Sequence, residues 1–151
     1  MKRRNEVTWF VLTDGSRARF LAGGPETPDY RLVGQYESKE ARLPSRELVS
    51  TPPTRVQESA YSGRHSVEPR RDPHVALKAA FARDIAAQLK AAGERREYTA
   101  LVLYADPRSL AVLRKALDAA TRSRVKAEIP KDLTKVPLAE LAQHFVADGV
   151  A

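Results

Sequence analysis

Two nearly unbroken apolar segments, Val7–Leu12 and Thr99–Ala105, restrict the fold of this 151-residue chain more than any other feature. Each has the length of a strand and is rich in aliphatic, β-branched and aromatic residues, which is typical of a strand covered on both faces. Between them, apolar residues recur at every fourth position from Leu77 to Leu89, which predicts an amphipathic helix. Because a helix connects the two strands, we expect them to run parallel in one sheet.

The residues after the first segment predict a hairpin and a third strand. Asp14-Gly15-Ser16 has turn chemistry, because Gly tolerates positive φ and the Asp and Ser side chains bond nearby backbone groups. Arg17–Leu21 then alternates polar and apolar residues. Tyr30–Tyr36 alternates again, with Leu32 and Tyr36 expected on one side. These segments predict a three-stranded antiparallel meander.

The remaining pattern predicts an edge strand at Val125–Ile129 and two more helices. Gly93 is expected to end the first helix. Asp106-Pro107 is expected to start the second helix, with Leu110, Leu113 and Leu117 facing inward. Pro137 is expected to start the last helix, with Leu138, Leu141 and Phe145 facing inward. The predicted fold class is therefore α/β. We expect a single mixed β-sheet, an antiparallel meander plus a parallel strand, with helices packed on it, in one domain spanning residues 1–151.

Residues 38–74 form a long segment rich in Pro and Arg, with little sustained apolar periodicity. A loop longer than about 12–15 residues is uncommon inside a compact domain and is usually either functional or disordered. Six Arg and a single Lys, Lys39, lie in this segment. Arg has a planar guanidinium that grips phosphates through two hydrogen bonds and stacks on bases. We therefore regard the segment as a candidate contact surface.

Composition narrows the classes of partner and of chemistry. The chain holds 26 Lys+Arg against 19 Asp+Glu, a formal net charge of +7, which favours an anionic partner, nucleic acid ahead of a membrane surface. The alternative is that the charge serves solubility alone. The absence of Cys excludes disulfides, thiolate zinc sites, iron–sulfur centres and Cys nucleophiles. With no export signal after Lys2-Arg3-Arg4 and no apolar run of about 18 residues, we expect a cytoplasmic protein without a membrane span.

The candidate nucleic-acid contacts are basic side chains in two groups. They could equally form a charged surface with mixed ion pairs, since acidic residues lie among them. The first group lies in or beside the long segment: Arg42, Arg46, Arg55, Arg64, His65, Arg70, Arg71 and His74. The second follows the second predicted helix: Arg122, Arg124, Lys126 and Lys131.

Four residues are candidates for catalysis. Asp14 and Asp106 follow strands expected to run parallel, so two carboxylates could hold a metal ion for phosphodiester cleavage. Their simpler roles are a turn residue and a helix N-cap. His65 and His74, near Glu68, could act as a general base, or belong to a solvated loop. Neither a Gly-x-Gly-x-x-Gly nor a Walker motif occurs, and no ligand spacing fits a metal, so we expect no cofactor and no metal.

Several short motifs follow one another along the chain: Thr8-Trp9-Phe10-Val11-Leu12-Thr13-Asp14-Gly15-Ser16-Arg17-Ala18-Arg19, Gly63-Arg64-His65, Glu68-Pro69-Arg70, Asp72-Pro73-His74, Phe81-Ala82-Arg83-Asp84-Ile85-Ala86, Leu101-Val102-Leu103 and Glu128-Ile129-Pro130-Lys131-Asp132-Leu133-Thr134. In this order, the sequence resembles the bacterial host-attachment protein family, described as required for attachment to host cells. The resemblance covers about Thr8 to Phe145.

That family is in turn similar to the middle domain of archaeal and eukaryotic translation release factors. There, a long loop carries Gly-Gly-Gln into the peptidyl-transferase centre of the ribosome. This chain has no Gly-Gly-Gln, so peptide release is not implied. The resemblance implies a release-factor-like fold and a non-enzymatic module that binds structured RNA, tRNA or the ribosome. Two alternatives stay open: a metal-dependent phosphodiesterase or RNA-linked ester hydrolase, and an attachment factor acting at the cell surface.

Overall fold

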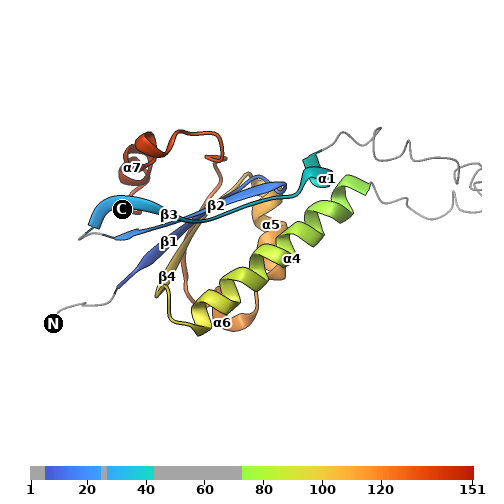
Figure 1. The fold of residues 1–151 in the computed structure, drawn as a ribbon, viewed down its shortest axis with the longest axis horizontal. Coiled ribbons are helices and arrows are strands. Elements are labelled where there is room, and N and C mark those ends of the chain that lie inside the picture. The colour runs from blue at the N-terminus through green and yellow to red at the C-terminus, as the bar shows by residue number, and fades with distance from the viewer. Residues whose placement is uncertain (1–5, 25–26, 43–72) are drawn as a thin grey trace, which may run out of the picture.

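A five-stranded mixed sheet forms the centre of the molecule (Figure 1). The computed structural model describes residues 6–24, 27–42 and 73–151. The strands lie in the order β3-β2-β1-β4-β5; β1, β2 and β3 pair antiparallel, and β4 pairs parallel with both β1 and β5. Their bounds are β1 Thr8–Thr13, β2 Arg17–Gly24, β3 Thr27–Glu37, β4 Ala100–Tyr104 and β5 Val125–Ile129. The predicted meander, the parallel crossover and the edge strand are confirmed.

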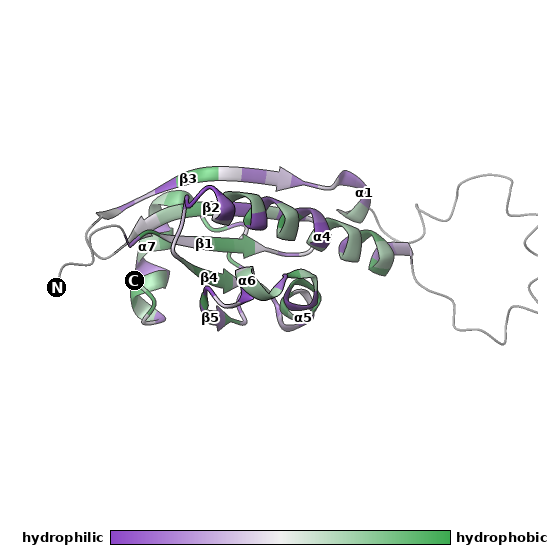
Figure 2. Cartoon of the chain, turned by 90° about the horizontal axis from the view of Figure 1, so that it is seen from below, coloured by the Kyte–Doolittle hydropathy of each residue, from purple (hydrophilic) through white to green (hydrophobic). Residues whose placement is uncertain are grey.

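Helices cover both faces of this sheet. The helix bounds are α1 Lys39–Arg42, α4 Pro73–Glu94, α5 Pro107–Ala116, α6 Ala119–Arg122 and α7 Leu138–Ala147. In Figure 1, α4, α5 and α6 lie on one side of the sheet and α7 lies on the other. Figure 2 shows hydrophilic and hydrophobic residues mixed along α4, as expected for a helix with one buried side. The predicted fold class, α/β with helices packed on one mixed sheet, is confirmed.

The central strands are apolar throughout because a core lies on each side of them. In β1, Trp9 and Val11 join the core under α4 and α5, whereas Phe10 and Leu12 join the core under α7. Successive side chains of a strand point to opposite faces, so each face of β1 needs its own apolar residues. The Phe10 ring stacks on the ring of Phe145 from α7, with centroids 4.2 Å apart. This packing explains the unbroken apolar segments.

The expected common side for Leu32 and Tyr36 in β3 is wrong. The pairing of β2 with β3 shifts between Phe20 and Leu21, which pair with Gly34 and Leu32. One residue of β3 is therefore extra at this point, as in a β-bulge. Leu32 faces the same side as its partner Leu21, which belongs to the core under α7, although Leu32 itself is 41% exposed. Tyr36 packs against the opposite core.

The expected role of Gly93 as the stop of the first long helix is also wrong. Gly93 lies inside α4, and the residue with positive φ beyond the helix is Arg96, at φ 57°. The amide of Arg96 donates to the carbonyl of Gly93, and the amide of Glu97 donates to that of Ala92, which is a Schellman motif. Gly93 instead permits a close approach, because an added Cβ would lie 2.7 Å from Nη1 of Arg124 and 2.8 Å from Oη of Tyr98.

The last helix matches its prediction in part. Pro137 stands at the N-cap of α7, and Leu141 and Phe145 are fully buried, as expected. Leu138, also expected inward, is 43% exposed. It is the first residue of the helix, where the backbone has not yet completed a turn against the sheet.

Candidate functional site

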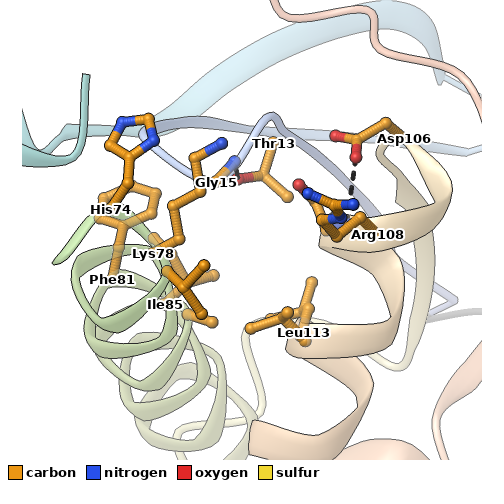
Figure 3. Close-up of a pocket in the computed structure, with 13 residues that line it drawn as sticks. Thr13, Gly15, His74, Lys78, Phe81, Ile85, Asp106, Arg108 and Leu113 are labelled. Atoms are coloured by element: carbon orange, nitrogen blue, oxygen red, sulfur yellow. Dashed lines mark hydrogen bonds between the residues drawn. The ribbon is translucent and has the colours of Figure 1, made fainter. Parts of the chain in front are cut away.

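A pocket opens at the carboxyl ends of β1 and β4, where ligands collect in open sheets with parallel strands (Figure 3). Three elements surround it: the first turns of α4, the turn between β1 and β2, and the start of α5. Its volume is about 120 Å³. Its position follows from the parallel pairing of β1 with β4, which brings the ends of both strands to one edge.

The inner wall of the pocket is apolar. Phe81 and Ile85 come from α4, one turn apart, and Val112 and Leu113 come from α5. Phe81, Ile85 and Leu113 also belong to the core between these helices and the sheet. Figure 3 shows Ile85 and Leu113 below the mouth of the pocket, on facing helices. The pocket is thus a gap at the end of the core, with a rigid wall.

Basic side chains lie at the mouth. Lys78 and His74 lie one turn apart at the start of α4, and Arg108 lies at the start of α5 (Figure 3). Neither Lys78 nor Arg108 forms an ion pair within the described ranges. Two cations from separate helices, neither of them in an ion pair among these residues, favour an anionic ligand beside the single carboxylate of the lining, that of Asp106.

The turn beside the pocket has fixed geometry. Gly15 has φ +92°, and an added Cβ would lie 3.2 Å from both Cδ of Lys78 and Oγ of Ser109. Asp14 accepts hydrogen bonds from the amide of Ser16 at 2.8 Å and from the amide of Arg17 at 2.9 Å. Partial burial raises the pKa of Asp14, but these hydrogen bonds outweigh it, so the pKa lies below its usual value. Asp14 is therefore held as a carboxylate inside the turn.

Asp106 is the N-cap of α5, which is the simpler of the two roles that the sequence suggested for it. It accepts a hydrogen bond from the amide of Ser109 at 3.1 Å. Asp106 lines the pocket, whereas Asp14 does not. Within the described parts of the chain, no three His, Asp or Glu side chains lie close enough together to hold a metal ion.

Comparison with known proteins agrees with this fold. A family model described as "Protein required for attachment to host cells" matches residues 9–145. The chain belongs to this family. The resemblance predicted from its motifs is therefore confirmed.

No functionally curated protein matches this host-attachment family member. Among solved structures, it is similar to a crystal structure of an archaeal translation termination factor, aRF1, with a TM-score of 0.51 and 8% identity. The match covers 97% of this chain and 39% of that one, so the chain spans well under half of the factor's length. The likeness shows a shared fold, as the sequence predicted. In the described parts of the chain, no helix is long and apolar enough to cross a membrane.

Most of the first predicted group of basic contacts in this host-attachment protein lies outside the described residues. His74 lines the pocket, and Arg42 ends α1. The others stay predictions from sequence: Arg46, Arg55, Arg64, His65, Arg70 and Arg71.

The second predicted group lies away from the pocket and has internal partners. Arg122 donates to the carbonyl of Leu117 at 3.0 Å. Arg124 donates to the carbonyl of Gly93 at 3.1 Å. Lys126 lies 3.5 Å from the hydroxyl of Thr8, and Lys131 forms an ion pair with Asp148 at 2.8 Å. These bonds give the four side chains structural roles whether or not they also contact a ligand.

Sequence reasoning missed Lys78 and Arg108, along with the hydroxyl residues Thr13 and Ser109 that line the same pocket. A signal for Arg108 and Ser109 was present, because they open the helix capped by Asp106, directly after a buried strand. Lys78 had a weaker signal. It follows Leu77 of the apolar stripe, and only the packing of α4 on the sheet brings it to the pocket mouth.

Proposed function

We propose that this host-attachment family member is a non-enzymatic module that binds structured RNA, such as tRNA or the ribosome, in the cytoplasm. The observation that carries the proposal is the pair of Lys78 and Arg108 at the pocket mouth, each without an ion pair among the described residues. Phosphates of RNA are the natural counter-charges for such a pair.

The place of the Arg-rich segment in the sequence supports the same surface. Residues 43–72 follow α1 and precede α4 along the chain, and the start of α4 forms one wall of the pocket. Their sequence adds Arg46, Arg55, Arg64, Arg70 and Arg71. The net charge of +7 gives long-range attraction for a polyanion. The basic segment leads in sequence directly into α4, which carries Lys78 at the pocket mouth. This adjacency supports one extended RNA contact.

The likeness to a translation termination factor supports RNA as the partner. It concerns the fold alone, at 8% identity, so it supports the class of partner and no activity. The chain lacks Gly-Gly-Gln, and peptide release is not part of the proposal.

The test is a titration of the purified protein against tRNA and against ribosomes at low and moderate salt. We expect Lys78→Ala together with Arg108→Ala to weaken binding at least tenfold, because the loss of even one charge-assisted hydrogen bond costs about 1.5–3 kcal/mol and tenfold is about 1.4 kcal/mol. Lys90→Ala with Lys115→Ala is the matched control, since these exposed residues lie on the same two helices outside the pocket. A third variant, Arg64→Ala with Arg70→Ala and Arg71→Ala, tests the segment.

Two results would contradict the proposal. One is the absence of salt-dependent binding to either RNA by the unmodified protein. The other is a Lys78/Arg108 variant that binds as tightly as its Lys90/Lys115 control. Cell fractionation addresses the rival role at the surface: we expect the protein with the ribosome or soluble fraction, and recovery only at the cell surface would favour direct attachment.

A further inference from the structure

The size of the pocket limits what can enter it. A cavity of about 150 Å³ lined by Leu, Ile and Phe takes up one benzene molecule. The pocket at the carboxyl ends of β1 and β4 has about 120 Å³ and a wall of the same residue types, including Phe81, Ile85 and Leu113. Its volume therefore suits one six-membered ring better than a fused pair of rings.

The polar groups are placed to hold a ring that carries an anion. Lys78 and Arg108 flank the mouth, above the apolar wall formed by Ile85 and Leu113 (Figure 3). The hydroxyl of Ser109 also lines the pocket and makes no hydrogen bond within the described residues. It can pair with a polar edge of a bound ring. The ligand class is thus a flat, partly polar ring joined to a phosphate.

The turn between β1 and β2 packs closely against these groups. At Gly15, a Cβ would contact both the Lys78 side chain and the Ser109 hydroxyl at 3.2 Å. The missing side chain therefore lets the backbone of the turn lie against the Lys78 stem and against Ser109, which is 9% exposed. The positive φ of Gly15 and this close approach together fix the shape of the mouth.

We propose that the pocket binds one unstacked pyrimidine base of single-stranded RNA, with Lys78 and Arg108 on the neighbouring phosphates. The inference rests on the proposed RNA binding and adds to it a base-sized site with a preference for single rings. Unpaired bases are the part of RNA that proteins commonly bury and read. The apolar wall supplies affinity, the volume discriminates against purines, and the two cations orient the backbone.

The experiment compares a labelled uridine hexanucleotide with an adenosine hexanucleotide by fluorescence anisotropy at low salt. Val112→Phe fills the pocket without changing charge, because Val112 lines it on the α5 side. We expect this change to weaken uridine-oligomer binding about tenfold, equivalent to about 1.4 kcal/mol, and to leave adenosine-oligomer binding within about twofold. Val146→Phe is the matched control, since Val146 is 68% exposed on α7 across the sheet. It should change neither affinity.

The outcomes separate the pocket from RNA binding in general. If the unmodified protein binds RNA but Val112→Phe leaves the uridine affinity unchanged or raises it, the pocket proposal is overturned and RNA binding stands. If the unmodified protein binds no RNA at low salt, both proposals fail. Any uridine preference that persists in Val112→Phe belongs to the backbone or to stacking within the oligomer, and also counts against the pocket.

A second measurement avoids dependence on the folding of the variant. Saturation-transfer NMR on the unmodified protein compares uridine monophosphate with adenosine monophosphate. We expect strong transfer to the pyrimidine ring protons and weak transfer to the purine protons. Equal transfer to both nucleotides, or stronger transfer to the purine, would overturn the proposed size selection.

Discussion

Two residues have separate roles at the end of α4: Arg96 adopts the left-handed conformation, and Gly93 permits close packing. Arg96 adopts the left-handed conformation that ends α4, although it has a Cβ, and Gly93 leaves room for Arg124 and Tyr98. The Tyr98 hydroxyl donates to the carbonyl of Leu89 at 2.6 Å, so this end of α4 is tied to the chain beyond it. Residue identity here reflects contacts across the fold as well as local conformation.

Replacing Arg96 with Gly should therefore stabilise the protein. We expect the free energy of unfolding to rise by about 0.5–1 kcal/mol, because the left-handed conformation costs a residue with a Cβ more than it costs Gly. Urea denaturation measures the change. Gly93→Ala is the contrasting variant, with an expected loss of about 1–3 kcal/mol from overpacking against Arg124 and Tyr98. A stability gain in Gly93→Ala would contradict this assignment of roles.

Asp148 makes the stability depend on pH at the end of α7. Its carboxylate accepts from Lys131 at 2.8 Å and from the Tyr104 hydroxyl at 2.7 Å. The hydrogen bond from Lys131, followed by that from Tyr104, lowers the pKa of Asp148. Because the folded-state pKa is lowered, the stability that Asp148 contributes is complete above its ordinary pKa. That contribution is lost as the pH falls through the folded-state pKa.

Asp148→Asn should reduce stability at neutral pH and flatten its decline in acid. We expect the difference in free energy of unfolding between variant and unmodified protein to shrink as the pH falls from about 5 to about 2. Chemical denaturation at a series of pH values gives this difference. Glu140→Gln, which removes one exposed carboxylate from the same helix, is the matched control. A difference that stays constant across this range would refute the linkage.

At the scale of elements, one side chain of β2 joins the sheet to the connection before α7. Arg19 lies on the sheet face covered by that connection, and its Nη1 donates to the carbonyls of Thr134 at 3.1 Å and Val136 at 2.7 Å. It also lies 3.4 Å from the carbonyl of Leu133. Arg19 faces away from Phe20, as the alternation of a strand requires, and the connection before α7 covers this face of β2.

Arg19→Met keeps the aliphatic stem and removes the donors. We expect a loss of about 1–3 kcal/mol in the free energy of unfolding, because the carbonyls lose charge-assisted hydrogen bonds in a partly buried setting. Hydrogen exchange should show weaker protection in the connection between β5 and α7. Arg31→Met on the edge strand β3 is the control and should be nearly neutral. Equal losses in the two variants would assign the effect to charge alone.

Helices and strands with strong hydrophobic periodicity were predictable from sequence. The structure differs from the prediction where contacts with residues distant in sequence outweigh the local pattern. The apolar runs of β1 and β4 and the stripe of α4 identified the sheet and its crossover. The bulge in β3 was not predictable, because alternation through Val33 gives no sign of an extra residue. Gly93 was misread because a glycine that ends a helix and one that permits a close approach look alike in sequence.

The candidate site was less predictable than the fold. Asp106 was recognised as a helix cap, and its place after a buried strand indicated the correct edge of the sheet. Lys78 and Arg108 are separated by the rest of α4 and by β4, so only the assembled fold brings them to one pocket. The contacts expected from Arg46 to Arg71 lie outside the described residues and stay predictions.

At the scale of the whole molecule, salt titration measures how many charges the RNA contact uses. For single strands, the logarithm of the binding constant falls against the logarithm of salt concentration with a slope of about 0.7 per phosphate neutralised. Removing Lys78 and Arg108 together should therefore reduce the slope by about 1.4. The Lys90/Lys115 double variant should keep the original slope. Identical slopes in all three proteins would place the neutralised phosphates elsewhere.

The central pairing of the sheet also has a consequence for how the chain acquires its structure. β1 bonds to β4, and the bond from the amide of Val7 to Thr99 closes a separation of 92 residues. During synthesis, β1, β2 and β3 emerge together and can pair locally, while the other edge of β1 has no neighbour until β4 leaves the ribosome. Long-range pairing is slow, and an open strand edge invites association with other chains. Changes that delay α4 or β4 should therefore lower the yield of folded protein more than equally destabilising changes in α7.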